Sequence, residues 1–154
     1  MTNTIEDLSL DVHYGHFFNL KCERFYRRVD LLLNVVQLLG GSAAMFVVMS
    51  DQPHLLTGAG VALASAAALS LLVGPAAKAA NHAFVKDRFT ALIGRYRSMN
   101  PDELAQVIAD YRVGAPVGID SLAMPAYNAA ALAMGREDAV APLSGVQRVA
   151  QAIA

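Results

Sequence analysis

Two long runs without a charged side chain lie close together in the first half of this 154-residue chain. Leu31–Met49 and Leu55–Ala77 contain no Asp, Glu, Lys or Arg, and the five residues Ser50–His54 between them are polar and include a proline. A helix rises about 1.5 Å per residue, so about 20 residues cross the roughly 30 Å hydrocarbon core of a bilayer. The sequence therefore predicts a transmembrane helical hairpin, with spans at about 31–50 and 55–74 joined by a tight turn.

The alternative is a pair of buried helices in the core of a soluble protein. Such helices usually keep charged residues on an outward face, and a chain of only 154 residues has little other mass to bury two of them. Its hydrophobic content of 55% is high and its charged content of 16% low. The membrane interpretation is therefore preferred. We expect an all-α integral membrane protein: residues 1–29 form a cytoplasmic N-terminal helix, 30–78 the two-helix hairpin and 79–154 a cytoplasmic helical region.

Basic residues flank the hairpin on both sides and are missing from its turn. Short flanks rich in Lys and Arg remain on the cytoplasmic side of a membrane. We therefore predict a multi-pass protein of the inner (plasma) membrane with both termini in the cytoplasm. The residues that set this topology, and that are also candidates for contacting anionic lipid headgroups, are Lys21, Arg24, Arg27, Arg28, Lys78, Lys86 and Arg88.

Small and polar residues within the spans predict close helix packing. Small residues four apart allow helix backbones to approach in lipid, which favours tight packing within the hairpin and between copies in a homo-oligomer. The candidate packing residues are Gly40, Ala44, Gly58, Ala62, Ala66 and Ser70. Polar groups in lipid tend to face a partner helix or water, so the candidates for an interhelix contact or a pore lumen are Asn34, Gln37 and Ser42.

Apolar residues at helical spacing predict a helix on either side of the hairpin. The first starts at Ser9 or Asp11, after a frayed N-terminus, and its apolar stripe comprises Tyr14, Phe18, Cys22, Phe25 and Val29. The second covers residues 79–99, with a stripe of Val85, Phe89, Leu92 and Tyr96. We expect these two stripes to pack against each other. Before the second helix, Gly74-Pro75 predicts a kink or break where the hairpin leaves the lipid.

The remaining sequence predicts three shorter helices and no strand. Asn100-Pro101-Asp102-Glu103 has the cap, the proline and the acidic residue of a helix start, and this helix runs to about Tyr111. A second helix covers the residues from 121 or 125 to 134 and ends at Gly135. A third begins at a Ser144 cap and carries Val146, Val149, Ala150 and Ile153 on one side.

No arrangement of residues predicts catalysis. His13, His16 and Cys22 lie near one another in sequence, but they lack the Cys pair, the acidic fourth ligand and the spacing of a zinc site. His82 is a candidate for titration near neutral pH. The charge-free spans argue against a proton relay, and the mixed flanks argue against nucleic-acid recognition. We expect a protein that is not an enzyme and uses no cofactor or metal; its expected partners are lipids, further copies of itself and a cytoplasmic protein.

In its overall plan the chain resembles the SLATT superfamily of small two-transmembrane proteins of bacteria and their mobile elements. The resemblance covers about residues 13–135 and rests on the aromatic and basic segment Phe25–Arg28, the hairpin, the helix Asn81–Tyr96 and the Pro125–Asn128 segment. It implies a membrane-perturbing or pore-forming effector in a conflict system, released from inhibition by a nucleotide-sensing partner. Because no partner domain is fused to this chain, such control would act in trans.

Three functions remain open at this point. The leading hypothesis is an oligomeric effector that permeabilises the inner membrane. A phage holin-like lysis protein is the second, although a holin needs little beyond its spans and about half of this chain follows them. The third is a membrane-anchored scaffold whose helices from Ala79 onward bind a cytoplasmic partner.

Overall fold

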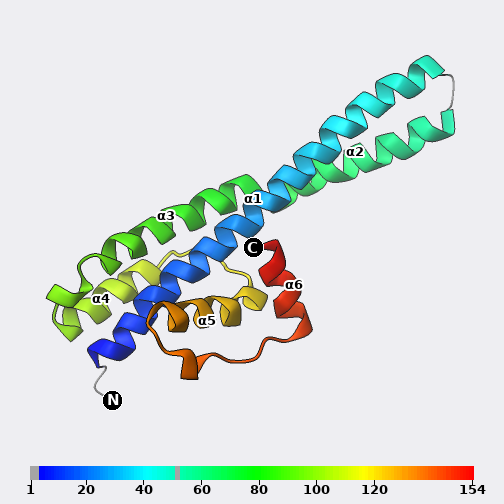
Figure 1. Ribbon diagram of the computed structural model, residues 1–154. Coiled ribbons are helices and arrows are strands. Elements are labelled where there is room, and N and C mark those ends of the chain that lie inside the picture. The colour runs from blue at the N-terminus through cyan, green and yellow to red at the C-terminus, as the bar shows by residue number, and fades with distance from the viewer. Residues whose placement is uncertain (1–3, 51–52) are drawn as a thin grey trace. The chain divides into compact units, whose positions relative to one another are not determined.

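The computed structural model of the chain is all-helical (Figure 1), which confirms the predicted all-α class. It describes residues 4–50 and 53–154, with side chains for 4–42 and 57–154. No strand occurs in these residues. The elements are α1 (Ile5–Ser50), α2 (Pro53–Val73), α3 (Pro75–Ile93), η1 (Tyr96–Ser98), α4 (Pro101–Arg112), η2 (Asp120–Leu122), α5 (Ala123–Ala133), η3 (Glu137–Ala139) and α6 (Gly145–Ile153).

The chain divides into two units. The helical unit comprises Met1–Phe25 and Lys78–Ala154, and the hairpin unit comprises Tyr26–Ala77. Helix α1 contributes to both units, and the chain leaves the hairpin unit through α3. The sequence-based boundaries are at 29/30 and 78/79.

Helix α1 begins at Ile5, earlier than the predicted start at Ser9 or Asp11. The reason is a cap that the sequence analysis missed. The Thr4 side chain accepts a hydrogen bond from the Asp7 backbone N–H at 3.2 Å, and its hydroxyl donates to the Asp7 carboxylate at 2.7 Å. A side-chain acceptor at this position satisfies one of the backbone donors that a helix N-terminus leaves unpaired.

Gly74 separates α2 from α3, at the position where the sequence predicts a kink or break. Its φ of 57° lies in the left-handed region, which is inexpensive only for glycine. Its backbone N–H still donates to the Ser70 carbonyl at 3.1 Å, closing the last turn of α2. Pro75 then occupies the first position of α3, where the missing N–H of proline costs no hydrogen bond.

The main hydrophobic cluster of the helical unit joins α1, α3 and α4. It comprises Leu8, Val12, Val85, Phe89, Leu92, Tyr96, Leu104 and Ile108. The predicted α3 stripe is thus buried as expected, although α3 itself ends at Ile93 and Tyr96 belongs to η1. Its partner face on α1 differs from the predicted stripe, because Gly15 lets the Phe89 ring approach the α1 backbone where a larger residue would not.

The predicted α1 stripe is instead divided between partly buried positions and a second cluster. Cys22 is fully buried and packs with Leu122, Ala150 and Ala154, while Phe18 and Phe25 pack around this group. These contacts bring η2 and α6 against α1.

The shorter helices begin and end where the sequence places them. Asn100 Oδ1 accepts the Glu103 backbone N–H at 2.8 Å, and Ser144 and Gln147 form a reciprocal capping box at the start of α6. Gly135 adopts a φ of 72° just after α5. The side chain of Asn128 on α5 donates to the Ala141 carbonyl at 2.7 Å and accepts the Ala141 N–H at 3.0 Å, which holds the segment before α6 against α5.

In the hairpin unit, the second half of α1 and α2 lie side by side (Figure 1). Within the part of the chain that the structure describes, one helical stretch, Thr57–Ile93, is long and apolar enough to cross a membrane, with a mean hydropathy of 1.8. Only 11% of its most apolar window is buried inside the protein. A two-span hairpin is therefore not confirmed; residues 51–52 of the predicted turn Ser50–His54 and the side chains of 43–56 lie outside the described residues.

Replacing Gly15 with Ala tests the close approach of α1 and α3. A Cβ at this position would lie 2.5 Å from the Phe89 ring, which is buried and contacts Tyr111 edge-to-face at 5.5 Å. Overpacking of this kind costs about 1–3 kcal/mol, which exceeds the gain of up to about 1 kcal/mol that Ala has over Gly inside a helix. We therefore expect a lower thermal unfolding midpoint for Gly15→Ala.

Gly145→Ala is the matched control, because an added Cβ at this first position of α6 meets no atom within 4 Å. Its unfolding midpoint should stay level or rise. A Gly15→Ala protein at least as stable as Gly145→Ala would contradict the packing described above.

Candidate functional site

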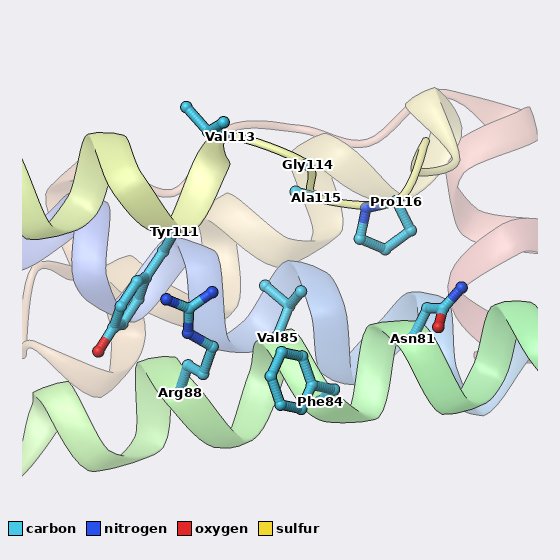
Figure 2. A pocket seen from close by; sticks show the side chains of 9 residues that line it. All are labelled: Asn81, Phe84, Val85, Arg88, Tyr111, Val113, Gly114, Ala115 and Pro116. Atoms are coloured by element: carbon cyan, nitrogen blue, oxygen red, sulfur yellow. The ribbon is translucent and has the colours of Figure 1, made fainter.

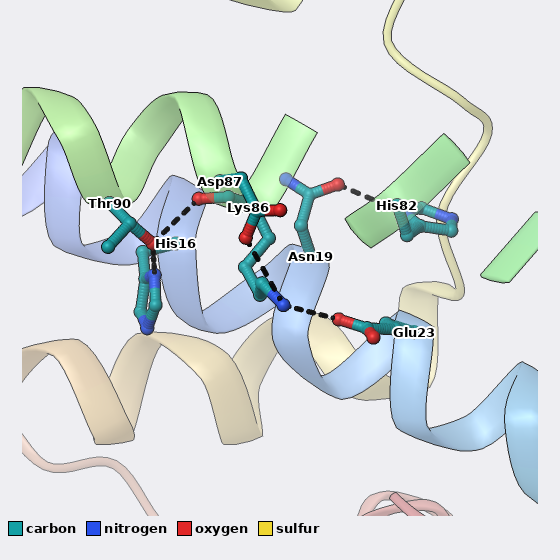
Figure 3. A network of polar contacts seen from close by, with 7 residues as sticks. All are labelled: His16, Asn19, Glu23, His82, Lys86, Asp87 and Thr90. Carbon is teal, nitrogen blue, oxygen red and sulfur yellow. Dashed lines mark hydrogen bonds and ion pairs between the residues drawn. The ribbon is translucent and has the colours of Figure 1, made fainter. Parts of the chain in front are cut away.

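A row of polar residues, here called the polar seam, joins α1 to α3 within the helical unit (Figure 3). Its members lie three or four residues apart on each helix, so each helix presents them on one face. The α1 residues are His16, Asn19 and Glu23, and the α3 residues are His82, Lys86 and Thr90. Each α1 side chain contacts a side chain of α3, so the seam holds together the two helices that lead into and out of the hairpin unit.

The centre of the seam is a hydrogen bond between Asn19 and His82. The Asn19 amide nitrogen donates to the Gly15 carbonyl at 2.8 Å, which turns its Oδ1 toward His82 Nδ1 at 2.8 Å. Because Oδ1 can only accept, His82 Nδ1 carries the proton. Both side chains are buried, and removing one partner would leave the other buried without it, at a cost of about 1–3 kcal/mol.

Burial also controls the ionisation of His82. It lowers the pKa of His82 below 6.5, and this effect outweighs the opposing influences of the Val117 backbone and the Glu23 carboxylate. The imidazole is therefore neutral at neutral pH. The neutral form is favoured here because protonation of His82 would place a positive charge between two packed helices.

Glu23 and Lys86 form an ion pair beside this hydrogen bond. Lys86 Nζ lies 2.8 Å from Glu23 Oε2 and 3.4 Å from Asp87 Oδ1. The side chains of Lys86 and Glu23 are 20% and 8% exposed, so solvent screens this pair less than a typical surface pair worth about 0–1 kcal/mol. The hydrogen bond with Glu23 raises the pKa of Lys86, which keeps the lysine charged.

His16 closes the seam at its other end. Its Nδ1 lies 2.9 Å from Thr90 Oγ1, whose hydroxyl donates to the Lys86 carbonyl at 2.9 Å. Burial and, after it, the positive charge of Lys86 lower the pKa of His16. His13, one turn earlier, packs edge-to-face on Tyr96 with ring centroids 6.0 Å apart, and burial lowers its pKa too.

Two cavities lie beside the α1–α3 pair, under the loop that follows α4. The first, of about 210 Å³, is lined by Asn81, Phe84, Val85, Arg88, Tyr111, Val113, Gly114, Ala115 and Pro116 (Figure 2). In it the Arg88 guanidinium carbon lies 4.0 Å from the centre of the Tyr111 ring, within cation–π range. The second, of about 250 Å³, is lined by Tyr14, Gly15, Phe18, Asn19, Val85, Phe89, Tyr111, Arg112, Ala115 and Pro116.

The linings of these cavities suit binding better than acid–base chemistry. Neither lining contains a carboxylate, an imidazole, a thiol or an aliphatic hydroxyl. Arg88 provides a cation in the first cavity, whereas Arg112 in the second is already paired with Asp11 at 3.0 Å. Within the described residues, no three His, Cys, Asp or Glu side chains gather into a possible metal site.

The predicted topology residues divide into two groups. Lys86 lies in the polar seam and Arg88 stacks on Tyr111, so both have partners inside the helical unit rather than a purely lipid-facing role. The others stay at or near the surface: Arg24, Arg27, Arg28 and Lys78 are exposed and Lys21 is half-buried.

Part of the predicted helix-packing set lies between the two helices of the hairpin unit. A Cβ on Gly40 would meet Leu63 of α2 at 3.5 Å, so α1 and α2 approach closely there. Ala66 is 4% exposed and Ser70 is half-buried. Gly40 therefore lies at a close approach of α1 and α2 within the hairpin unit.

The other described residues of the predicted helix-packing set do not lie between the two helices of the hairpin unit. Gly58 and Ala62 are exposed, and a Cβ on Gly58 would meet no atom within 4 Å. The row of small residues that appears continuous in the sequence thus curves from the outer surface of α2 into the hairpin interior. The side chain of Ala44 lies outside the described residues.

The three polar residues of the first span have different surroundings. Asn34 donates to Asp30 at 3.1 Å, and the Ser42 hydroxyl donates to the Leu38 carbonyl at 3.0 Å, so both find partners on their own helix. The buried amide nitrogen of Gln37 has no hydrogen-bond partner among the described residues. Gln37 is therefore the member of this set that would gain most from another chain or from water.

Sequence reasoning missed the polar seam. No role is predicted from the sequence for Asn19 or Glu23, and His82 is considered only as a candidate for titration near neutral pH. A usable signal was present: Asn19 and Glu23, like His82 and Lys86, are polar pairs four residues apart on helices with apolar stripes. That spacing places each pair on one helix face, but the sequence does not say that the two faces meet.

The chain was also compared with protein families, characterised proteins and solved structures. None of the three comparisons gave a match. The resemblance to SLATT proteins accordingly rests on the sequence motifs alone.

Protonation of the buried histidines should destabilise the fold. Their folded-state pKa values lie below 6.5, so the unfolded chain binds these protons more readily. The stability from neutral histidine is complete above the unfolded pKa and is lost as pH falls through the folded pKa. We expect the thermal unfolding midpoint to fall from about pH 7.5 to about pH 5.

His82→Gln should reduce this pH dependence more than His16→Gln does, because His82 is fully buried and His16 only half-buried. The His16 variant is thus the matched control. A midpoint that rises on acidification, or equal slopes for the two variants, would contradict a central role for His82.

Proposed function

We propose that this chain is a two-span protein of the bacterial inner (plasma) membrane that acts as a non-enzymatic, homo-oligomeric, SLATT-like membrane-permeabilising effector. In this proposal the spans are the second half of α1 and α2, and the helical unit lies in the cytoplasm with both termini.

The observation that carries the proposal is the exposure of large apolar side chains on α2. In a soluble protein such residues are mostly buried, whereas Leu71 and Leu72 are 85% and 84% exposed. The same holds for the described part of the first span, where Leu31, Leu32, Leu38 and Leu39 are exposed. Helices that are apolar all round and uncovered by the rest of the chain fit a lipid environment.

Oligomer formation is supported by two features of the hairpin unit. Gly58 and Ala62 give α2 a small-residue outer face that its own hairpin does not cover, and small faces promote helix association in lipid. Gln37 brings a buried amide nitrogen without a hydrogen-bond partner among the described residues. A single hairpin cannot enclose a pore, so permeabilisation requires several copies.

The orientation can be tested by cysteine labelling in intact cells. The single native cysteine, Cys22, is fully buried, and burial raises its thiol pKa, so it should stay unlabelled. A membrane-impermeant maleimide should label Asp51→Cys from outside and should label Ser98→Cys only after lysis. Labelling of Ser98→Cys in intact cells would contradict cytoplasmic termini, and loss of Asp51→Cys labelling would contradict the second crossing.

Permeabilisation can be tested by induced expression with a membrane-potential dye, and by dye release from vesicles that contain the purified protein. We expect the wild-type chain to depolarise cells and release dye. Ala62→Leu should reduce both signals at least about tenfold, because a large side chain on the small-residue face blocks close helix approach.

Val61→Leu is the matched control, since it places the same residue at an already large, 62% exposed position in the same helical turn. It should behave like wild type. Membrane-inserted wild-type protein that changes neither signal would contradict the effector proposal and favour the scaffold alternative.

A further inference from the structure

A wide apolar groove lies along α6 at the C-terminal end of the helical unit. It has a volume of about 520 Å³ and is lined by Phe25, Gly145, Val146, Val149, Ala150 and Ile153. Every lining side chain is apolar. The groove shares no lining residue with the two cavities beside the α1–α3 pair.

Helix α6 packs on the helical unit through one face and leaves the neighbouring face uncovered. Ala150 and Ala154 pack against Cys22 and Leu122. The adjacent apolar residues are open: Val146 is 71%, Val149 60% and Ile153 41% exposed. Helix geometry places Gln151 and Arg148 toward the opposite side, so the open face is apolar and the far face polar.

The cationic residues Lys21 and Arg24 of α1 lie within four residues of Phe25, which lines the groove. Lys21 lies one helical turn before Phe25 and so shares its face, and Arg24 is exposed. Burial and then the positive charge of Arg24 lower the pKa of Lys21, which indicates that the two cations repel each other. An anionic group placed beside them would relieve this repulsion.

Phe25, which lines the groove, is close in sequence to the first charge-free run. Phe25 is the last residue of the helical unit on α1, and the charge-free run begins at Leu31. Six residues cover at most about 21 Å even when fully extended. If the run enters lipid, Phe25 and the groove that it lines lie within reach of the headgroup region.

We propose that α6 is an interfacial helix whose open face of Val146, Val149 and Ile153 rests in the headgroup boundary of an anionic bilayer, with acyl chains filling the groove beside Phe25. This inference rests on the proposed membrane insertion. The amphipathic helix α6, the apolar groove and the nearby cations of α1 together favour a negatively charged lipid surface. In this proposal Lys21 and Arg24 bind lipid headgroups at this groove.

The absence of tryptophan from the chain permits a direct test. Single-tryptophan variants of the full chain are reconstituted in anionic vesicles that contain lipids brominated near the headgroup. Val149→Trp should be quenched at least about twofold more strongly than Gln151→Trp, its control on the polar side of the same helix. Val146→Trp, at the most exposed position, repeats the measurement if the first variant folds poorly.

Two further variants separate the possible failures. Leu72→Trp, on the exposed surface of α2, reports membrane insertion by itself. Quenching of Leu72→Trp without quenching of Val149→Trp or Val146→Trp would overturn only the α6 proposal; loss of both signals would overturn membrane insertion as well. Adding Lys21→Gln and Arg24→Gln to Val149→Trp should lower its quenching in anionic vesicles toward the level in zwitterionic ones.

The other occupants of the groove give distinct results. If a second copy of the chain covers α6, Val149→Trp will be shielded from aqueous acrylamide but not quenched by brominated lipid. Equal quenching of Val149→Trp and Gln151→Trp would show that α6 has no fixed side toward the membrane. Either result overturns the proposal.

Discussion

The pairing of α1 with α3 is the contact on which the rest of the helical unit depends. These are the helices through which the chain enters the hairpin unit and leaves it again. Two kinds of interaction hold them. The hydrophobic cluster around Val12 and Phe89 buries apolar side chains of both helices. The polar seam adds side-chain pairs that meet in only one alignment of the two helices.

The seam determines register in a way that an apolar interface alone would not. Apolar side chains tolerate sliding because the hydrophobic effect has no direction. A slide of one turn would separate Asn19 from His82 and Glu23 from Lys86, leaving polar groups buried without those partners. Each such loss costs about 1–3 kcal/mol. The same contacts make the register sensitive to pH, because the neutral form of His82 is the one that fits.

Much of the local structure was predictable because its causes lie within a few residues. The Asn100 and Ser144 caps and the ends at Gly74 and Gly135 follow from side-chain chemistry at helix termini. The tertiary contacts were less accessible. A stripe shows which face is apolar, but the close fit of Phe89 against Gly15 shifted the α1 contact face to Leu8 and Val12, and no local pattern shows that one polar face meets another.

The two units satisfy their polar groups differently, which bears on how copies would associate. In the helical unit, polar side chains pair across helices, as Asn19 does with His82. In the hairpin unit, Asn34 and Ser42 bond within their own helix, and Gln37 keeps a buried amide nitrogen unmatched among the described residues. A polar amide without a partner and an exposed small-residue face are both features that gain more from a second hairpin than from lipid. The features that would favour the proposed association of copies therefore lie in the hairpin unit, whereas the polar seam pairs its side chains within the helical unit.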